Sequence, residues 1–356
     1  MRLKTALIGY GYAGSVFHAP LIAATAGLEL STIVTGDRDR AAAARRSFPD
    51  ARIEAEVDAV FERATGHDLV VVASPNDSHV EIATRAVELG IPVVVDKPLA
   101  PTADAAAGLV ERAERAGVPL TVFQNRRWDS DHLTLRRLIE ADELGEVLRY
   151  ESRFERWRPR SRGDAWRQTT PPETGGGLAL DLCTHLVDQA VMLFGAPRAV
   201  YAEFDHRRGG PADDDVFIAL EHRTGTRSHL WASDFAAAPG PRLRVLGSSA
   251  SFVVDSLDGQ EEALRAGTKP QEDPSWGVES RSDWGSLYRS GDDVEAVVPE
   301  RGDWPGFYAG VVTALVTEGR MPVDPRVAVE VLRVLESARE GGNMSLRTDE
   351  SDRKRA

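Results

Sequence analysis

The first third of the chain alternates short apolar runs with longer, alanine-rich stretches. The apolar runs, which we expect to be strands, lie at 3–8, 28–34, 69–73, 92–95 and 120–123. The stretches between them, which we expect to be helices, lie at 39–48, 56–64, 78–90 and 102–117. Strands that alternate with helices at this spacing predict βαβ units and a parallel, doubly wound sheet. The continuously apolar runs are typical of strands that are covered on both faces.

The pattern changes at about residue 125, beyond which several apolar runs alternate with polar residues. Strands are predicted at 147–156, 198–206, 214–222, 226–234, 241–247 and 250–255, and helices at 178–194 and 325–340. This pattern indicates a large, open, mostly antiparallel sheet that is covered by helices on one face. We therefore expect an α/β domain over 1–124 and an α+β domain over 125–340, whose late helix packs back on the first domain. The polar tail 341–356 is predicted to be disordered.

Composition narrows the possible functions. The chain carries 43 Lys and Arg against 56 Asp and Glu, which gives a formal net charge of −13. This balance argues against nucleic acid or an anionic membrane as the main partner, because both select basic surfaces. The single Cys excludes a disulfide framework, and no apolar run has the roughly 18 residues that a membrane span needs. The N-terminus lacks the features of a signal peptide, so we expect a cytoplasmic protein.

The first predicted strand runs directly into a glycine-rich loop with the sequence GYGYAG at 9–14. In such a loop the first glycine permits a tight turn, the second lets the backbone approach a pyrophosphate, and the third lets the next helix pack closely. The motif lies between a strand and a helix in a run of βαβ units, which favours dinucleotide binding over a plain glycine turn. The residues assigned to this cofactor loop are Gly9, Gly11, Tyr12, Ala13 and Gly14.

The end of the second strand bears on the choice between NAD and NADP. An NAD site expects an acidic residue there to hold the ribose 2′-hydroxyl, whereas this strand ends at Val34-Thr35. The Thr35 hydroxyl, the Gly36 amide and the Arg38 guanidinium are candidates for binding a 2′-phosphate. Asp37 leaves NAD open, since a shift of the loop would bring its carboxylate to the ribose. We therefore favour NADP over NAD, with solvated loop charges as the alternative for Arg38.

A lysine follows the fourth predicted strand of the parallel sheet, in the sequence Asp96-Lys97-Pro98. Ligands of doubly wound sheets bind at the carboxyl ends of the strands, so Lys97 is placed at the cofactor crevice. Pro98 keeps Lys97 extended and leaves both cis and trans open for the bond between them. Only four of the 43 basic residues are Lys. A lysine here suggests a need for a compact ammonium group.

Three polar residues interrupt the apolar helix at 178–194, which follows a run of three glycines at 175–177. Asp181, His185 and Asp188 lie on one face, because they are four and three residues apart. A carboxylate and an imidazole in an apolar helix are costly unless they are paired or functional. A structural Asp–His pair is the alternative to a catalytic one. No HExxH motif or histidine cluster completes a metal site, and we expect no metal. The acidic run 213–215 is read as a turn before a strand, with a metal site as a remote alternative.

Together these motifs resemble the Gfo/Idh/MocA oxidoreductases, in their order and over nearly the whole chain. Further stretches at 9–22, 125–135, 156–167 and 258–277 are similar to the NADP-dependent scyllo-inositol dehydrogenases of that family. The resemblance implies catalytic roles and substrate contacts for Lys97, Asp181 and His185. It also implies a cofactor-and-substrate loop and a cleft between the domains, whose residues are Ser74, Pro75, Asn76 and His79 for the loop and Asn125 and Arg127 for the cleft. The chain departs from the family in two places, with Asp96 in place of the usual Glu beside the cofactor, and Gly36-Asp37 where close relatives carry Ser-Arg.

The resemblance implies reversible hydride transfer between the nicotinamide of NADP or NAD and a secondary alcohol of a polyol or sugar, with scyllo-inositol as the leading substrate. His185 would accept the hydroxyl proton, and Lys97 would bind the oxygen that becomes the carbonyl. Alternatives are a dehydrogenase of another sugar or sugar phosphate, an NAD-dependent lyase or glycosidase, and a non-catalytic NADP-binding sensor. We also expect a homodimer or homotetramer that forms through the second-domain sheet.

An arginine-rich segment at 153–167 stands out in this acidic chain. One interpretation is a loop over the active site, in which Trp157, Arg158 and Trp166 contact the substrate. The alternative is a solvated loop or a contact between subunits, where Arg and Trp are enriched. The sequence does not decide between these two interpretations.

Overall fold

The first domain is built on a six-stranded parallel sheet with the order β3-β2-β1-β4-β5-β6. This computed structural model describes residues 2–62, 66–160, 166–290 and 293–341. The six strands are β1 (Leu3–Ile8), β2 (Leu28–Val34), β3 (Arg52–Glu54), β4 (Leu69–Val72), β5 (Val93–Asp96) and β6 (Leu120–Phe123). β4, β5 and β6 are buried along their whole length, as their continuous apolar runs predict. The predicted doubly wound sheet is confirmed.

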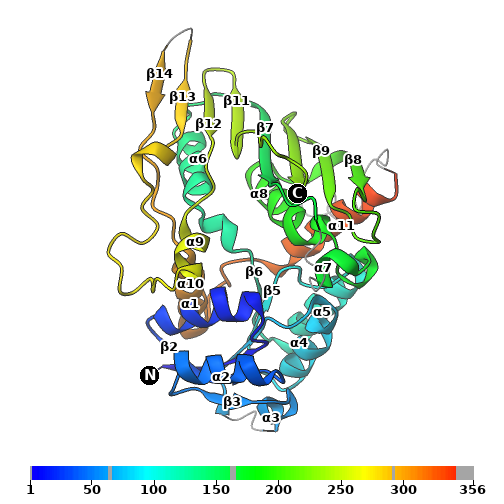
Figure 1. Cartoon of the computed structure of the whole chain (residues 1–356), viewed down its shortest axis with the longest axis vertical. Helices are drawn as coiled ribbons and strands as arrows, with labels where there is room; N and C mark the ends of the chain where they lie inside the picture. The colour runs from blue at the N-terminus through cyan, green and yellow to red at the C-terminus, as the bar shows by residue number, and fades with distance from the viewer. Residues whose placement is uncertain (1, 63–65, 161–165, 291–292, 342–356) are drawn as a thin grey trace.

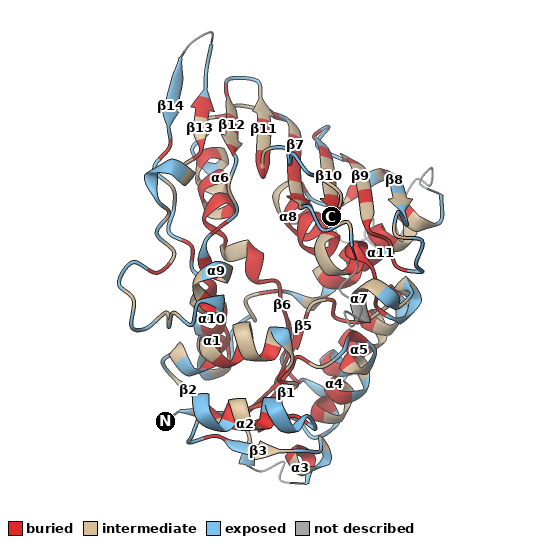
Figure 2. Ribbon diagram, in the orientation of Figure 1, coloured by how far each residue is buried: buried red, intermediate tan, exposed pale blue. Residues whose placement is uncertain are grey.

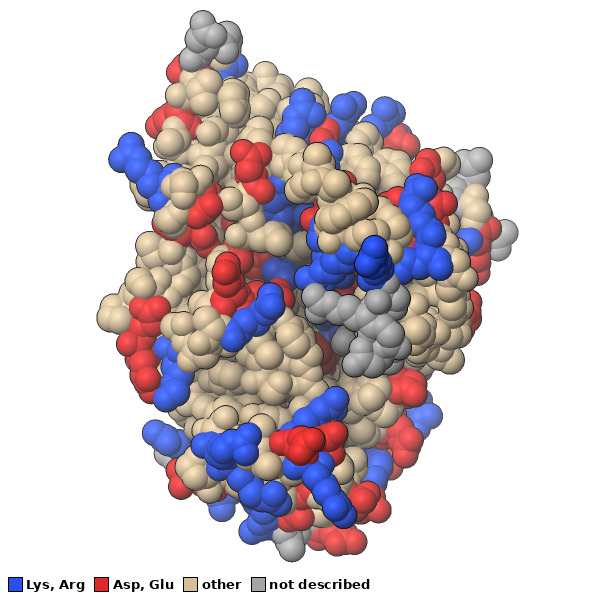
Figure 3. Space-filling model, in the orientation of Figure 1, with Lys and Arg blue, Asp and Glu red and all other residues tan. Residues whose placement is uncertain are grey.

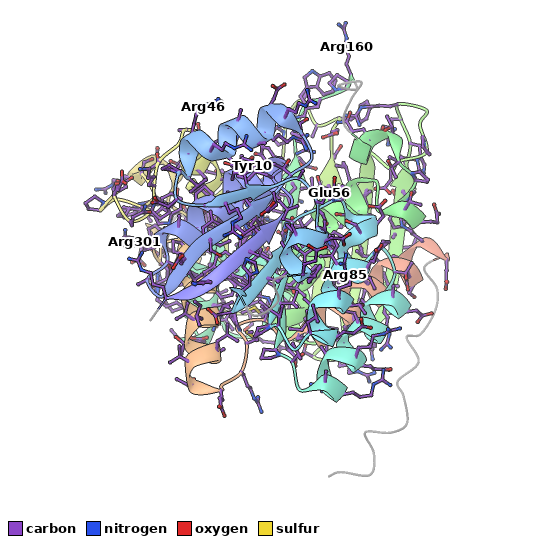
Figure 4. The ribbon with its side chains drawn as sticks, turned by 90° about the horizontal axis from the view of Figure 1, so that it is seen from below. Tyr10, Arg46, Glu56, Arg85, Arg160 and Arg301 are labelled. Carbon is purple, nitrogen blue, oxygen red and sulfur yellow. The ribbon has the colours of Figure 1, made fainter. Side chains whose placement is uncertain are left out.

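Helices cover both faces of this sheet. They are the π-helical turn η1 (Ala13–His18), α1 (Ala19–Ala24), α2 (Arg38–Ser47), α3 (Asp58–Phe61), α4 (His79–Glu88) and α5 (Ala103–Ala116). Seen from below, Arg46 marks α2 on one side of the sheet, and Arg85 of α4 lies on the other side (Figure 4). The strand order reverses between β1 and β4, so the carboxyl ends of these strands border the crevice where doubly wound sheets bind ligands.

The second domain lies above the first in Figure 1 and contains an eight-stranded sheet with the order β14-β13-β12-β11-β7-β10-β9-β8. Its strands are β7 (Val147–Glu155), β8 (Pro197–Asp205), β9 (Asp215–His222), β10 (Arg227–Ser233), β11 (Leu243–Gly247), β12 (Ser251–Val254), β13 (Ser286–Tyr288) and β14 (Val294–Ala296). Neighbouring strands are antiparallel except β7 and β10, which are parallel. The mostly antiparallel sheet is therefore confirmed.

One face of this second sheet is packed and the other is open. Residues along β9 alternate between buried and half-buried, and Figure 2 shows the same alternation on its neighbours. The buried face packs on two helices, α8 (Thr184–Phe194) and α11 (Pro325–Arg339). Burying one face of an antiparallel sheet requires this period of two, which is why six of the eight strands were visible in the sequence.

The remaining helical segments of the second domain are short or lie at the junction with the first. They are η4 (Asn125–Trp128), α6 (Ser130–Glu140), α7 (Trp166–Thr169), η5 (Pro172–Thr174), η6 (Ala179–Cys183), α9 (Gln260–Arg265), η7 (Arg281–Asp283) and α10 (Trp304–Thr317). α10 escaped the sequence analysis because its aromatic, β-branched and glycine residues do not indicate a helix. Packing overrides that preference, since Trp304, Phe307 and Tyr308 are fully buried.

The last helix, α11, contacts both domains. Asp324 caps it by accepting a hydrogen bond from the Arg326 amide, and Pro325 occupies its first turn as the sequence predicts. It packs on α5 of the first domain and on α8 and β8 of the second. Most of the predicted tail, residues 342–356, lies outside the described residues. None of the described helices is long and apolar enough to cross a membrane.

Candidate active site

The glycine loop follows β1 at the crevice, and its three glycines meet different surroundings. Gly9 has φ +103°, and a Cβ atom there would collide with the main chain of Ala73. A Cβ on Gly14 would collide with the Gly9 carbonyl. At Gly11, by contrast, the nearest atom would be a nitrogen of the Arg40 guanidinium at 3.9 Å. Gly9 and Gly14 are thus required by packing, whereas Gly11 borders open space, which fits the approach of a pyrophosphate.

The helix that follows the loop begins with the π-helical turn η1, directly after Tyr12. The first amides of a helix have no partner within it, so they are available for an anion. Tyr12 is half exposed, while Ala13 is the first residue of the turn. The shape of the loop therefore fits the diphosphate of a dinucleotide, and the assignment of its individual residues to cofactor binding stays a prediction.

At the end of β2, the side chain of Asp37 is already engaged. It caps α2 by accepting a hydrogen bond from the Arg40 amide at 2.9 Å, and that bond lowers the pKa of the Asp37 carboxyl. Thr35 is buried and its amide donates to the Glu54 carbonyl, whereas Gly36 and Arg38 are exposed. Arg40 thus places its guanidinium close to the open Gly11, and Arg38 is exposed at the start of the same helix.

The loop after β4 is held in a fixed shape by its own side chains. The hydroxyls of Ser74 and Ser78 lie 2.7 Å apart around the short helix η3 (Asn76–Ser78), which follows Pro75. His79 is buried, and its two ring nitrogens lie 2.9 Å from the carbonyl oxygens of Pro98 and Ser74. His79 therefore ties this loop to the turn that follows β5.

Asn76 connects the same loop to the second domain. Its Nδ2 donates a hydrogen bond of 2.9 Å to the Gly175 carbonyl, and the amide is buried. A Cβ atom on Gly175, which has φ +98°, would lie 2.8 Å from that of Asn76. The glycine run therefore lets the helix that carries Asp181 and His185 begin in direct contact with the first domain, which its sequence position alone did not reveal.

Lys97 lies at the carboxyl end of β5 and reaches Asp181 in η6. The Lys97–Pro98 bond is cis. The Lys97 ammonium donates to the Asp181 carbonyl oxygen and lies 3.1 Å from Asp181 Oδ1. Both side chains remain partly exposed, at 13% and 25%. The structure thus brings together the two residues that the sequence placed 84 positions apart, and leaves them accessible to a small molecule.

Asp96, the neighbour of Lys97, is buried below this pair. Its Oδ1 accepts the Lys97 amide at 2.9 Å and lies 3.5 Å from His18 Nε2, while His18 Nδ1 lies 2.6 Å from the Tyr308 hydroxyl. Burial favours the neutral acid, but the neighbouring His18 ring and the charge of Lys97 outweigh it and lower the Asp96 pKa. Asp96 is therefore an anion that fixes the backbone at Lys97.

His185 is buried at the start of α8, after the π-helical turn η6 that carries Asp181. Its Nδ1 lies 3.1 Å from Gln124 Oε1. An amide oxygen only accepts, so Nδ1 carries the proton and Nε2 keeps a lone pair. Burial, then the positive charge of Lys97, lowers the His185 pKa well below its usual value, so the ring is neutral near pH 7. Sequence reasoning missed Gln124, which follows β6 directly.

Beside this centre, Arg127 and Asp188 form a buried pair. The guanidinium donates two hydrogen bonds, of 2.7 and 2.6 Å, to the two carboxylate oxygens of Asp188. Asp188 thus has a structural partner, although the sequence places it on the same face as Asp181. Asn125 is buried at the start of η4. Of the predicted cleft residues, Arg127 joins η4 to α8 through its ion pair with Asp188.

The arginine-rich segment is divided between paired and exposed side chains. Arg156 and Arg208 both bind the buried Asp234, at 2.5 and 2.7 Å. Trp157 and Arg158 are exposed, and Arg160 points away from the body of the protein (Figure 4). Basic side chains gather on the second-domain side of the hollow between the domains (Figure 3). The side chain of Trp166 and residues 161–165 lie outside the described part of the chain.

The acidic run at 213–215 stabilises the fold through Asp213. Asp213 Oδ1 accepts the Ala179 amide at 2.7 Å, and its Oδ2 binds the Arg339 guanidinium. A Cβ on Gly177 would collide with the same carboxylate. Asp213, shortly before β9, therefore holds the first turn of the helix that carries Asp181 and His185. Within the described ranges, no three His, Cys, Asp or Glu side chains come together as a group that could bind a metal ion.

Comparison with known proteins agrees with this geometry. Residues 3–124 match the oxidoreductase family with an NAD-binding Rossmann fold, and residues 132–253 match the GFO/IDH/MocA C-terminal domain. The uncharacterized oxidoreductase YdgJ of Escherichia coli is 40% identical over 94% of this chain and 95% of its own. The NADP(+) scyllo-inositol 2-dehydrogenase IolW of Bacillus subtilis is 33% identical over 95% of this chain and 93% of its own.

Solved structures agree over the same length. YvaA from Bacillus subtilis superposes with a TM-score of 0.88 at 32% identity, covering 95% of both chains. YPO2259 from Yersinia pestis gives a TM-score of 0.88 at 33% identity, covering 98% of both chains. The agreement extends across both domains and therefore across the crevice between them. The chain belongs to the Gfo/Idh/MocA family of oxidoreductases, and its first domain is an NAD-binding Rossmann domain.

Proposed function

We propose that the chain is an NADP-dependent dehydrogenase that interconverts a secondary alcohol and a ketone of a cyclic polyol or sugar, with scyllo-inositol as the leading substrate. The observation that carries the proposal is the convergence of Lys97, Asp181 and His185 beside the glycine loop. A non-catalytic sensor would not require an ammonium, a carboxylate and a neutral imidazole at the same edge of the crevice.

Each of these three residues has a distinct role in the proposed reaction. The dinucleotide, when bound, supplies or accepts the hydride. His185, whose Nε2 keeps a lone pair, accepts the hydroxyl proton of the alcohol. The Lys97 ammonium donates a hydrogen bond to the same oxygen and stabilises the negative charge that develops on it. Asp181 holds the ammonium at 3.1 Å and orients a neighbouring hydroxyl.

The preference for NADP rests on the surroundings of the ribose-binding edge. Asp37 Oδ1 caps α2 by accepting the Arg40 amide, which holds this carboxylate at the start of the helix and leaves only Oδ2 for a ribose hydroxyl. Arg38 and Arg40 are exposed at that edge and would bind a phosphate by charge-assisted hydrogen bonds. The similarity to IolW, an NADP(+) scyllo-inositol 2-dehydrogenase, points in the same direction.

We also propose that two copies associate through the open face of the second sheet. Tyr201 is 53% exposed there, and its ring lies 6.4 Å from that of Phe217, which lies 5.1 Å from Trp231. Exposed aromatic residues of this kind are enriched at interfaces between proteins. Replacing Tyr201 by arginine should shift the mass measured by light scattering toward the monomer, and an unchanged dimer would contradict this assignment.

The experiment that tests the function is a screen at 340 nm of NADP and NAD against inositol isomers, glucose, xylose and sugar phosphates. We expect net reduction of NADP with an inositol. Turnover of a sugar phosphate alone would replace scyllo-inositol as the proposed substrate. Cleavage of a compound without net reduction of the dinucleotide would indicate a lyase. Binding of NADPH without turnover of any compound would indicate a sensor.

A further inference from the structure

Glu261, an acidic residue of the second domain, contacts the glycine loop. Glu261 of α9 accepts a hydrogen bond of 3.0 Å from the Tyr12 hydroxyl at its Oε1. Its Oε2 binds the Arg126 guanidinium at 2.6 Å. Each carboxylate oxygen thus has its own partner, one in the cofactor loop and one in η4, which follows β6. Glu261 joins two segments that are separated by more than 110 residues in the sequence.

These three side chains belong to a closed ring of contacts. The Tyr12 ring lies edge-on to Phe17 at 5.3 Å, and Phe17 lies edge-on to Trp304 at 5.6 Å. Arg126 closes the ring by lying 5.6 Å from the Trp304 ring. Because each member is held from two sides, movement of Tyr12 is coupled to that of Arg126.

Arg126 in turn lies beside the catalytic histidine. Its guanidinium lies 4.8 Å from the centre of the Phe154 ring, which is edge-on to His185 at 6.4 Å. The guanidinium is buried and also binds Asp129 at 3.2 Å. A change in its position would therefore alter both the packing and the charge around the imidazole.

We propose that Glu261 is a positioning residue, which holds Tyr12 of the cofactor loop and Arg126 of η4 in one unit. Dinucleotide binding and the placement of His185 are thereby coupled. Tyr12 lies between Gly11 and Gly14 of the loop. Holding it in place before the dinucleotide arrives reduces the ordering cost of binding. The inference rests on binding of the dinucleotide at this loop and does not depend on which substrate is used.

The test compares Tyr12→Phe, Glu261→Gln and the double variant in the full chain. Phenylalanine keeps the ring that packs on Phe17 and removes only the hydroxyl. The affinities of the substrate-free protein for NADPH and NADH are measured by nucleotide fluorescence. The values of kcat and of KM for the dinucleotide are measured with saturating polyol. The matched control is Glu262→Gln, which removes an exposed carboxylate from the same helix.

We expect each single variant to bind the dinucleotide about two- to tenfold more weakly, the range for one lost hydrogen bond. The double variant should be no weaker than Glu261→Gln alone, because both changes remove the same contact. Of the two single variants, only Glu261→Gln should also lower kcat, since Arg126 then loses its carboxylate partner at position 261. Unchanged dinucleotide binding by Tyr12→Phe, additive losses in the double variant, or an equal loss in Glu262→Gln would each overturn the inference. A wild-type chain that binds neither dinucleotide would overturn the proposed function together with it.

Discussion

Replacing Gly11 by alanine should separate folding from dinucleotide binding. The added Cβ would meet no atom closer than the end of the flexible Arg40 side chain at 3.9 Å, and Gly11 does not have a positive φ. Alanine at a compatible position stabilises a fold by about 0.4–1 kcal/mol, because it restricts the unfolded chain. The substrate-free variant should therefore unfold at the same temperature as the wild type or slightly higher.

The same methyl group would occupy the space that a pyrophosphate needs. Overpacking of one methyl group costs about 1–3 kcal/mol, which corresponds to an affinity about 5- to 150-fold lower. Titration with NADPH gives the affinity, and thermal unfolding without ligand gives the stability. Gly14→Ala is the contrasting variant, because its Cβ would collide with the Gly9 carbonyl and destabilise the substrate-free fold. Wild-type affinity in Gly11→Ala would refute the assignment of the loop.

Four further predictions concern the active site. Lys97→Ala should lower kcat about 10²- to 10³-fold, as loss of one donor to a developing oxyanion does, while Lys269→Ala, which removes an exposed ammonium, should not; near-normal turnover of Lys97→Ala would remove it from the site. The pKa of His185 is lowered by burial and by Lys97, so kcat/KM for alcohol oxidation should show no loss from this group between pH 8 and about 6.5 and fall only at lower pH. A fall in kcat/KM centred above about pH 6.5, which disappears when His185 is replaced, would contradict this. The same group makes the fold less stable as pH falls below about 6.5, because the unfolded chain then binds a proton that the folded chain excludes, and chemical denaturation at several pH values measures this. Arg40→Ala should weaken NADP binding about tenfold and leave NAD unchanged, since one charge-assisted hydrogen bond to a phosphate is lost; equal losses for both cofactors would argue for a structural role.

The sequence predicted those parts of the site that depend on short-range order. The glycine loop and Lys97 each follow a strand directly, so the strand pattern alone places them at the crevice. The spacing of Asp181 and His185 likewise follows from the helix that carries them. These features need only the local periodicity and the rule that parallel strands end at one edge.

The supporting residues could not be predicted in the same way, because their partners are remote in the sequence. Gln124 is 61 residues from His185, and Glu261 is 135 residues from Arg126. No local pattern distinguishes these polar residues from solvated ones. Asp188 illustrates the limit most directly: its spacing placed it on one face with Asp181 and His185, whereas its ion pair with Arg127 depends on how η4 crosses the helix.

The start of the helix that carries Asp181 and His185 depends on α11. On α11, Arg339 binds Asp213, which in turn accepts the Ala179 amide at the first turn of that helix. Three residues earlier on α11, Glu336 accepts the Ala103 amide at the start of α5 in the first domain, at 2.8 Å. Residues three apart share a helix face, so one face of α11 fixes the start of η6 to the dinucleotide-binding domain. The last helix is therefore part of the frame that sets the distance between Lys97 and His185.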